Sequence, residues 1–175
     1  MSEETSKKAA IPFNYDVDDK SNTNKAPKFN VASKNGMRDR RFRIEHAQQL
    51  APGTPSRFGK EGVVASVQPY QLLDDADVAG KKLGDDRAER ESYLFKLLLN
   101  SNALVALGSD WPVVDINPLK CISLDDAIKG YTISAGRASF IDNDLGSLSI
   151  GKLADFVILS TDSWKDFTET TSNSS

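Results

Sequence analysis

Three short strand-like segments of apolar residues are spaced along the middle of the chain. In residues 42–47, apolar and polar side chains alternate, which places His46 on the same face as two apolar side chains. Residues 63–68 and 104–107 are instead nearly continuous apolar runs, typical of strands buried on both faces of a parallel sheet. The pattern therefore predicts three strands, two of them fully buried.

Two segments between these strands carry the residue types and spacing of helices. Residues 52–60 fit a short helix, and residues 85–100 place their large apolar side chains on one side of a longer one. The resulting order is strand, helix, strand, helix, strand. Such an order predicts βα units, a parallel sheet and an α/β fold.

The second half of the chain predicts a further helix followed by a pair of strands. Ser123 begins a sequence with the form of a capping box, so its hydroxyl is expected to accept an amide hydrogen bond at a helix start. The stretch 132–140 either extends this helix or forms a second short one. Residues 145–159 have the pattern of strand, tight turn and strand.

Both ends of the chain lack hydrophobic periodicity. Residues 1–34 contain few large apolar side chains and are expected to form a disordered arm. The Ser/Thr-rich residues 165–175 are expected to form a disordered tail. We therefore place the folded part in a main domain over 35–144 and a pair of closing strands over 145–164.

The charge pattern argues against nucleic acid and membrane partners. The net charge is −3, with acids and bases interspersed, and no apolar run is long enough to span a membrane. The basic segment 34–43 has two interpretations, a nuclear-import or nucleic-acid patch and a solvated turn, and we favour the turn because Asp39 interrupts it. Residues 1–8 are polar and do not resemble a signal peptide. An intracellular, cytoplasmic location is expected, with a nuclear or perinuclear one as the alternative.

The chain contains one histidine and one cysteine. Cys121 cannot form an intrachain disulfide and has the character of a small buried hydrophobic residue. Because His46 is the single histidine, one copy of the chain cannot support a mechanism that needs several imidazoles.

Four motifs follow one another along the chain: Arg43-Ile44-Glu45-His46-Ala47-Gln48, Val67-Gln68-Pro69, Gly108-Ser109-Asp110-Trp111-Pro112-Val113, and Gly146-Ser147-Leu148 with Gly151-Lys152-Leu153-Ala154-Asp155. Their order resembles that of a group of metal-dependent amidohydrolases. This group is similar to N-substituted formamide deformylase and includes the plant long-after-far-red proteins, and the resemblance covers residues from about 35 to 164.

The resemblance implies a fold and a chemistry. The fold is a partial (β/α)8 TIM barrel of about the last three βα units, together with the C-terminal strands of the amidohydrolase β-sandwich. The chemistry is hydrolysis of carbon–nitrogen bonds in amide-type small molecules by water activated on a divalent metal, usually zinc. His46 matches a metal ligand, and Asp110 matches an aspartate that binds metal and acts as the general base. Gly108 precedes Asp110 and would allow close approach of a ligand to the backbone.

The chain also departs from the family pattern. The His-x-His pair of the family's first strand is missing, and one imidazole with one carboxylate is fewer than the three or so protein ligands that zinc uses. The short junction 118–123 resembles an internal deletion. We therefore expect a truncated form that binds metal poorly and is inactive alone. The alternative is a non-catalytic regulatory or interaction protein, in plant light signalling by resemblance, with a protein partner or a full-length sibling. A third interpretation is a poorly folded product.

Overall fold

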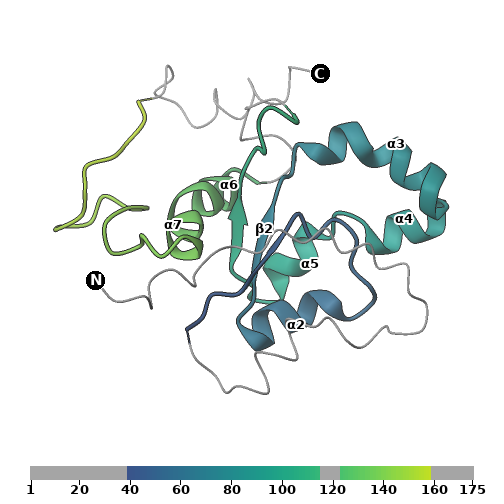
Figure 1. Cartoon of the computed structure of the whole chain (residues 1–175), viewed down its shortest axis with the longest axis horizontal. Coiled ribbons are helices and arrows are strands. Elements are labelled where there is room, and N and C mark those ends of the chain that lie inside the picture. The colour runs from purple at the N-terminus through teal and green to yellow at the C-terminus, as the bar shows by residue number, and fades with distance from the viewer. Residues whose placement is uncertain (1–38, 115–122, 159–175) are drawn as a thin grey trace, which may run out of the picture. The chain divides into compact units, whose positions relative to one another are not determined.

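The computed structural model describes residues 39–114 and 123–158. The predicted arm over 1–34, the tail over 165–175 and Cys121 lie outside the described residues. Within them, strands and helices follow one another up to residue 107, residues 124–138 are helical, and residues 139–158 form turns and extended chain (Figure 1). In chain order the elements are β1 (Arg43–Glu45), α2 (Thr54–Glu61), β2 (Val64–Val67), α3 (Gln71–Leu83), α4 (Asp85–Glu91), α5 (Phe95–Asn100), β3 (Val105–Leu107), α6 (Leu124–Lys129), η2 (Gly130–Ser134) and α7 (Ala135–Ala138).

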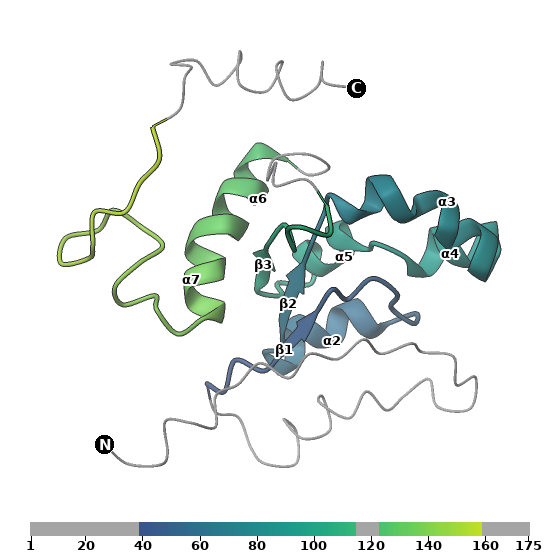
Figure 2. The ribbon, with the colours of Figure 1, turned by 45° about the horizontal axis from the view of Figure 1, so that its top comes forward.

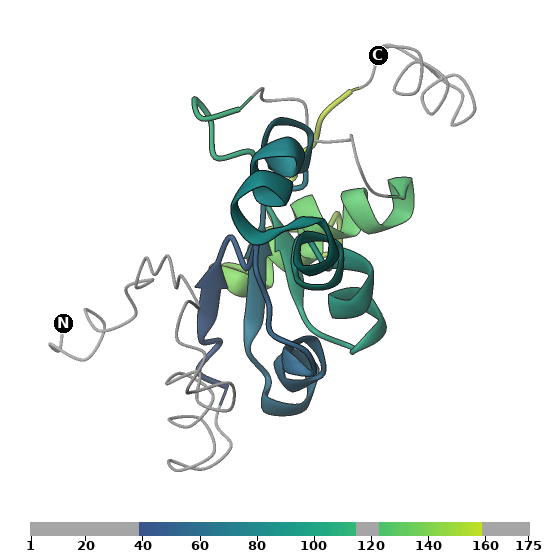
Figure 3. The ribbon, with the colours of Figure 1, turned by 90° about the vertical axis from the view of Figure 1, so that its right-hand side faces the viewer.

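The three predicted strands form one sheet in the order β1-β2-β3 (Figure 2). β1 and β2 run parallel, and the views in Figures 2 and 3 show them side by side. The central strand β2 is bonded on both sides, because its Val64 amide donates to the Phe42 carbonyl at 2.7 Å and its Ala65 amide donates to Leu104 at 2.9 Å. β2 and β3 are buried, and β1 is half-buried. The fold is therefore mixed α/β with a small parallel sheet, as the apolar runs predicted.

The chain divides into two compact units. One comprises Met1–Val67 and Asp77–Val105, and the other comprises Gln68–Ala76 and Ala106–Ser175. In the first unit, Phe58 of α2 and Leu98 of α5 are completely buried. α2 begins after Gly53 and ends at Gly62, whose φ of 65° is the left-handed conformation typical of a helix C-terminus. The short helix predicted over 52–60 is therefore confirmed.

The single helix predicted over 85–100 is wrong in one respect, because the structure divides it into α4 and α5. The break lies at Tyr93, which has a φ of 52°. At this break, backbone groups bond to the segment after β1 and not within a helix. The Tyr93 amide donates to the Gln48 carbonyl, and the Leu50 amide donates to the Glu91 carbonyl, both at 2.7 Å. A tertiary contact thus overrides the helical pattern.

In the second unit, α6, η2 and α7 form one uninterrupted helical segment over residues 124–138, drawn in green in Figures 1 and 2. The predicted cap is confirmed, because the Ser123 hydroxyl accepts a hydrogen bond from the Asp126 amide at 3.3 Å. Of the two alternatives for the stretch after 132, the structure has the extended helix. Its middle turn is a π-helix, a form that often marks functional positions.

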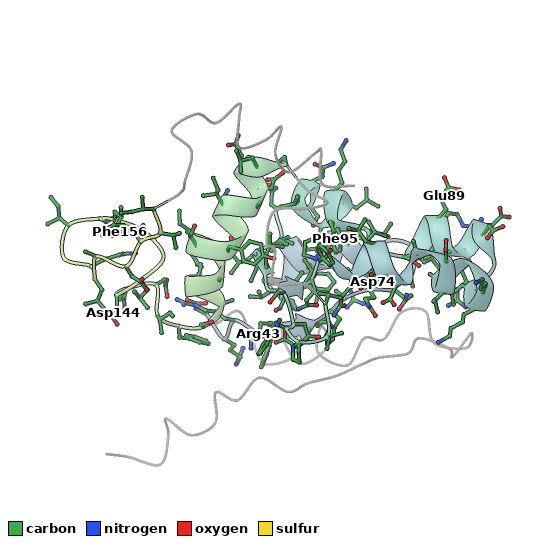
Figure 4. The ribbon with its side chains drawn as sticks, turned by 90° about the horizontal axis from the view of Figure 1, so that it is seen from above. Arg43, Asp74, Glu89, Phe95, Asp144 and Phe156 are labelled. Carbon is green, nitrogen blue, oxygen red and sulfur yellow. The ribbon has the colours of Figure 1, made fainter. Side chains whose placement is uncertain are left out.

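The two strands predicted over 145–159 are not present in the described residues 145–158. This segment forms turns and extended chain, held by a hydrogen bond from the Leu153 amide to the Asp144 carbonyl at 2.9 Å and by Lys152 Nζ on the Asp142 carbonyl at 2.6 Å. A strand needs a neighbouring strand for its backbone groups, and the described residues supply none here. The large apolar side chains of the segment, among them Phe156 in Figure 4, are consequently exposed.

Candidate functional site

His46 directly follows β1, the position that the sequence predicted for it. Its φ is 65°, and that of Ala47 is 47°, so the chain turns sharply at the end of the strand. The turn is closed by a hydrogen bond from the Ala47 amide to the Glu45 carbonyl at 2.8 Å. Left-handed backbone at a residue other than glycine costs on the order of 1 kcal/mol and is concentrated at functional positions. The half-buried imidazole therefore lies at a strained strand end.

Asp110 lies three residues after β3 and has the same backbone conformation, with a φ of 60°. Its carbonyl accepts the Val113 amide at 2.9 Å, and the neighbouring Trp111 amide donates to the Ser109 hydroxyl at 3.3 Å. These bonds form a tight loop that presents Asp110 to solvent. Its carboxylate oxygen Oδ2 accepts a hydrogen bond from Gln71 Nε2 at 3.1 Å.

Gln71 fixes this carboxylate from the start of α3. Its side chain is buried, and its backbone amide donates to the Gln68 carbonyl at 3.2 Å, just after β2 ends. Two hydrogen bonds of Gln71 thus connect Gln68 to Asp110 within the second unit. The sequence contained no signal for this role, because residue 71 lies outside the motifs and a glutamine at a helix start carries no spacing pattern.

A second contact supports the loop from η2. The Tyr131 hydroxyl donates to the Gly108 carbonyl at 3.4 Å, and partial burial raises the pKa of this phenol above its ordinary value. The preceding residue, Gly130, packs closely against Leu107, where a Cβ would lie 2.6 Å from Cδ1 of that leucine. Only glycine brings the π-turn this near to β3.

Gln68 is the remaining polar residue at this end of β2. Only 7% of its surface is exposed, and its side-chain oxygen Oε1 has no hydrogen-bond partner within 39–114 and 123–158. Gln68 lies within the motif Val67-Gln68-Pro69, and the sequence pattern alone indicates no role for it. Its burial and its open acceptor are visible only in the folded structure.

The donor types present suit zinc, but their number in the described ranges does not complete a site. An imidazole and a carboxylate are both zinc ligands, and protein zinc sites use about three or four. In the parts of the chain that the structure describes, no three His, Cys, Asp or Glu residues gather to hold a metal ion. His46 belongs to the first unit and Asp110 to the second. Neither unit by itself holds a metal centre within those residues.

Comparison with known proteins decides the family. The family model described as "Amidohydrolase family" matches residues 17–171. The chain belongs to the amidohydrolase family. This amidohydrolase domain is 59% identical over 165 residues to Protein LONG AFTER FAR-RED 3 of Arabidopsis thaliana, an alignment that covers 82% of the chain and 28% of the relative.

Two further proteins share the sequence or the fold of this amidohydrolase domain. N-substituted formamide deformylase of Arthrobacter pascens is 22% identical over 141 residues, which cover 69% of the chain and 26% of that enzyme. The crystal structure of an uncharacterized metal-dependent hydrolase from Pyrococcus horikoshii superposes with a TM-score of 0.65 at 24% identity, covering 77% of the chain and 31% of the hydrolase. The chain therefore spans less than a third of the length of these proteins. None of the helices in the described ranges has the length and apolar character needed to cross a membrane.

Proposed function

We propose that this amidohydrolase domain supplies two ligands, His46 and Asp110, to a metal centre that hydrolyses carbon–nitrogen bonds, and that the other ligands come from residues outside the chain. The observation that carries the proposal is the shared backbone geometry of the two residues. Each follows a strand of the small sheet in left-handed conformation, where the family motifs lie. Barrel enzymes keep their reacting groups at such strand ends.

The same reasoning extends to the architecture. We propose that β1, β2 and β3 are the last three strands of a (β/α)8 TIM barrel, with the remaining strands outside this chain. The share of the relatives that the chain covers, 28% and 31%, supports an incomplete barrel. The exposed apolar residues over 145–158 are those that would pair as strands of the adjoining β-sandwich.

Each residue has a distinct role in the proposed chemistry. A divalent metal, zinc by the donor set, would supply an activated water when bound. His46 would hold the ion through a ring nitrogen. Asp110 would help to hold it, and its carboxylate would serve as the general base that takes up a proton and returns it to the leaving nitrogen. Gln71 keeps that carboxylate in one orientation through its 3.1 Å hydrogen bond. The substrate class is an N-substituted small amide, by analogy with the deformylase relative.

The experiment combines the chain with its complement. The chain alone and the chain mixed with the unmatched portion of the Arabidopsis relative are purified, and both are assayed for zinc content and for hydrolysis of N-butylformamide. We expect the chain alone to retain far less than one zinc per molecule and to show no turnover. The mixture is expected to bind zinc and release formate.

The variants His46→Asn and Asp110→Asn test the two residues. Each is expected to abolish turnover of the mixture, whereas Asp144→Asn, at an exposed aspartate of the same unit as Asp110, leaves it unchanged. Stoichiometric zinc and turnover by the chain alone would overturn the need for outside ligands. An active mixture that carries either asparagine variant would overturn the assigned roles.

A second candidate function is a non-catalytic interaction protein, and one observation favours it. The consecutive residues Phe156, Val157 and Ile158 are 61%, 84% and 84% exposed. So much apolar surface in extended chain is typical of a segment that pairs with another polypeptide. The proposed partner is a full-length sibling of the chain, and the process would be light signalling, by analogy with the plant relative.

The two candidates differ in their response to mutation. If the interaction is the function, binding to the full-length Arabidopsis relative, measured by calorimetry, survives His46→Asn and Asp110→Asn. The same binding is lost in Val157→Lys, which places a charge within the exposed apolar segment. Retained binding in Val157→Lys would exclude this segment as the interface.

A further inference from the structure

His46 lies between two segments of the first unit that are both held by hydrogen bonds. Before it, β1 pairs with the neighbouring strand β2 as far as Glu45. After it, the backbone of Gln48 is bonded to Tyr93, beyond the end of α4. The link between the two held segments therefore consists of His46 and Ala47 alone.

Both residues of this link have left-handed backbone, with φ values of 65° at His46 and 47° at Ala47. Residues other than glycine keep this conformation only where the surrounding structure enforces it. The hydrogen bond from the Ala47 amide to the Glu45 carbonyl joins the link to the strand before it. The conformation of His46 therefore also depends on what holds the chain after Ala47.

Three hydrogen bonds hold that following segment to the break between α4 and α5. The Tyr93 amide donates to the Gln48 carbonyl at 2.7 Å, and the Leu50 amide donates to the Glu91 carbonyl at the same distance. The third bond joins two side chains, because Gln48 Nε2 donates to the Tyr93 hydroxyl at 3.0 Å. Residues 48 and 93 are thus bonded to each other through both backbone and side chain.

Tyr93 is itself held in place. Its side chain is buried, and its ring meets the Phe95 ring edge to face, with the two centroids 5.8 Å apart. Its phenol oxygen consequently occupies a fixed position in the first unit. The Gln48 side chain that donates to this oxygen is restricted with it.

We propose that Tyr93 is a positioning residue for the His46 imidazole and acts through its hydrogen bonds to Gln48. Without the phenol hydroxyl, the side-chain part of this hold is lost, and the link at His46 and Ala47 relaxes more often toward ordinary right-handed backbone. The imidazole moves with the backbone that carries it. The inference rests on the proposed function, in which His46 is a metal ligand, and adds the group that holds this ligand.

The test begins with the whole chain free of metal. Because His46 is the single histidine of the sequence, NMR signals of an imidazole ring belong to it without further assignment. Hydrogen exchange of the Ala47 amide reports the opening of the turn. In Tyr93→Phe we expect shifted ring signals and exchange about fivefold faster at Ala47, the effect of one lost hydrogen bond.

Tyr131→Phe is the matched control. It also deletes a phenol hydroxyl that makes a hydrogen bond, in this case to the Gly108 carbonyl in the second unit. A merely structural role would make the two variants alike, because each loses one such bond. We expect Tyr131→Phe to leave the His46 ring signals and the Ala47 exchange unchanged.

Gln48→Met removes the other partner of the side-chain bond. It is expected to reproduce the effect of Tyr93→Phe, and the double variant is expected to add nothing further, because all three lack the same bond. Additive effects in the double variant would show that the two side chains act separately. If Tyr93→Phe does not fold, Gln48→Met provides the same measurement.

Zinc binding by the mixture of the chain with the unmatched portion of the Arabidopsis relative separates the inference from the proposed function. With Tyr93→Phe, half-saturation is expected to need about fivefold more zinc. Unchanged ring signals and exchange in Tyr93→Phe, an equal effect in Tyr131→Phe, or an unaltered zinc affinity would each overturn the inference. A mixture with the unaltered chain that binds no zinc would reject the proposed function, and the metal-free measurements would still decide whether Tyr93 holds His46.

Discussion

Gln71 Nε2 donates a hydrogen bond to Asp110 Oδ2 across 3.1 Å, and this bond joins two segments 39 residues apart in the sequence. The glutamine is buried at the first position of α3, whereas the aspartate is exposed. A buried amide therefore determines where an exposed carboxylate points. The orientation of the predicted general base depends on a residue outside every family motif.

Removing this hydrogen bond is expected to destabilise the protein modestly. Gln71→Met keeps the length of the side chain and deletes the donor, and we expect a loss of about 1 kcal/mol in the free energy of unfolding, since the exposed carboxylate regains water. Urea denaturation measures the loss. Asp77→Asn, at an exposed position of the same helix, is expected to change stability little. Equal stability of Gln71→Met and the parent chain would show that the bond contributes nothing.

Two glycines in helical segments should respond to alanine in opposite directions. Gly130→Ala forces a methyl group to within 2.6 Å of Leu107 Cδ1 and is expected to destabilise by about 1–3 kcal/mol. Gly80→Ala in α3 meets only the flexible Asp85 side chain at 3.0 Å, so its helix propensity is expected to stabilise by about 0.5–1 kcal/mol. Thermal unfolding of both variants measures these shifts. A Gly130→Ala variant as stable as the parent chain would contradict the close packing of η2 on β3, and a destabilised Gly80→Ala variant would contradict the freedom of the Asp85 side chain to move aside.

Tyr131 predicts a pH dependence at the alkaline end. Burial raises the pKa of its phenol in the folded state above the unfolded value of 10.0. The folded state therefore holds this proton more tightly, so the contribution is complete below pH 10 and is lost as the pH rises through the folded-state pKa. Urea midpoints from pH 8 to 11 should fall less steeply in Tyr131→Phe than in the parent chain. Parallel pH profiles would show that this phenol does not titrate differently on folding.

The N-cap of α6 offers a test of local structure. Ser123→Ala removes the acceptor of the Asp126 amide and the donor to the Asp126 carboxylate, and it is expected to cost about 1 kcal/mol. Ser123→Thr retains the hydroxyl and is expected to restore most of that stability. Circular dichroism during urea unfolding measures both variants. If alanine and threonine are equivalent, the cap seen in the structure makes no contribution.

The sequence predicted the local features of this fold better than those that depend on distant contacts. The apolar runs at 63–68 and 104–107 identified the buried strands, and Ser123 identified a helix start, because each signal is contained within a few residues. The break at Tyr93 was missed because its cause lies more than 40 residues earlier, in the carbonyl of Gln48.

The candidate site divides in the same way. His46 and Asp110 were predicted from motifs, and the structure places each just beyond a strand, while their joint role in a metal centre stays a prediction. Gln71 and Tyr131 were missed because their importance comes from the atoms they reach, and nothing in the sequence specifies a 3.1 Å contact between residues 71 and 110. The roles of these two residues become visible only from their burial and hydrogen bonds in the folded chain.

The left-handed backbone at His46 and Asp110 limits which replacements are informative. Asparagine, aspartate and histidine enter this region several times more readily than other residues with side chains, and β-branched residues are outliers there. A valine at either position would distort the turn while it removed the donor atoms, so loss of activity would have two causes. Asparagine preserves the turn, which makes it the replacement that separates metal ligation from chain geometry.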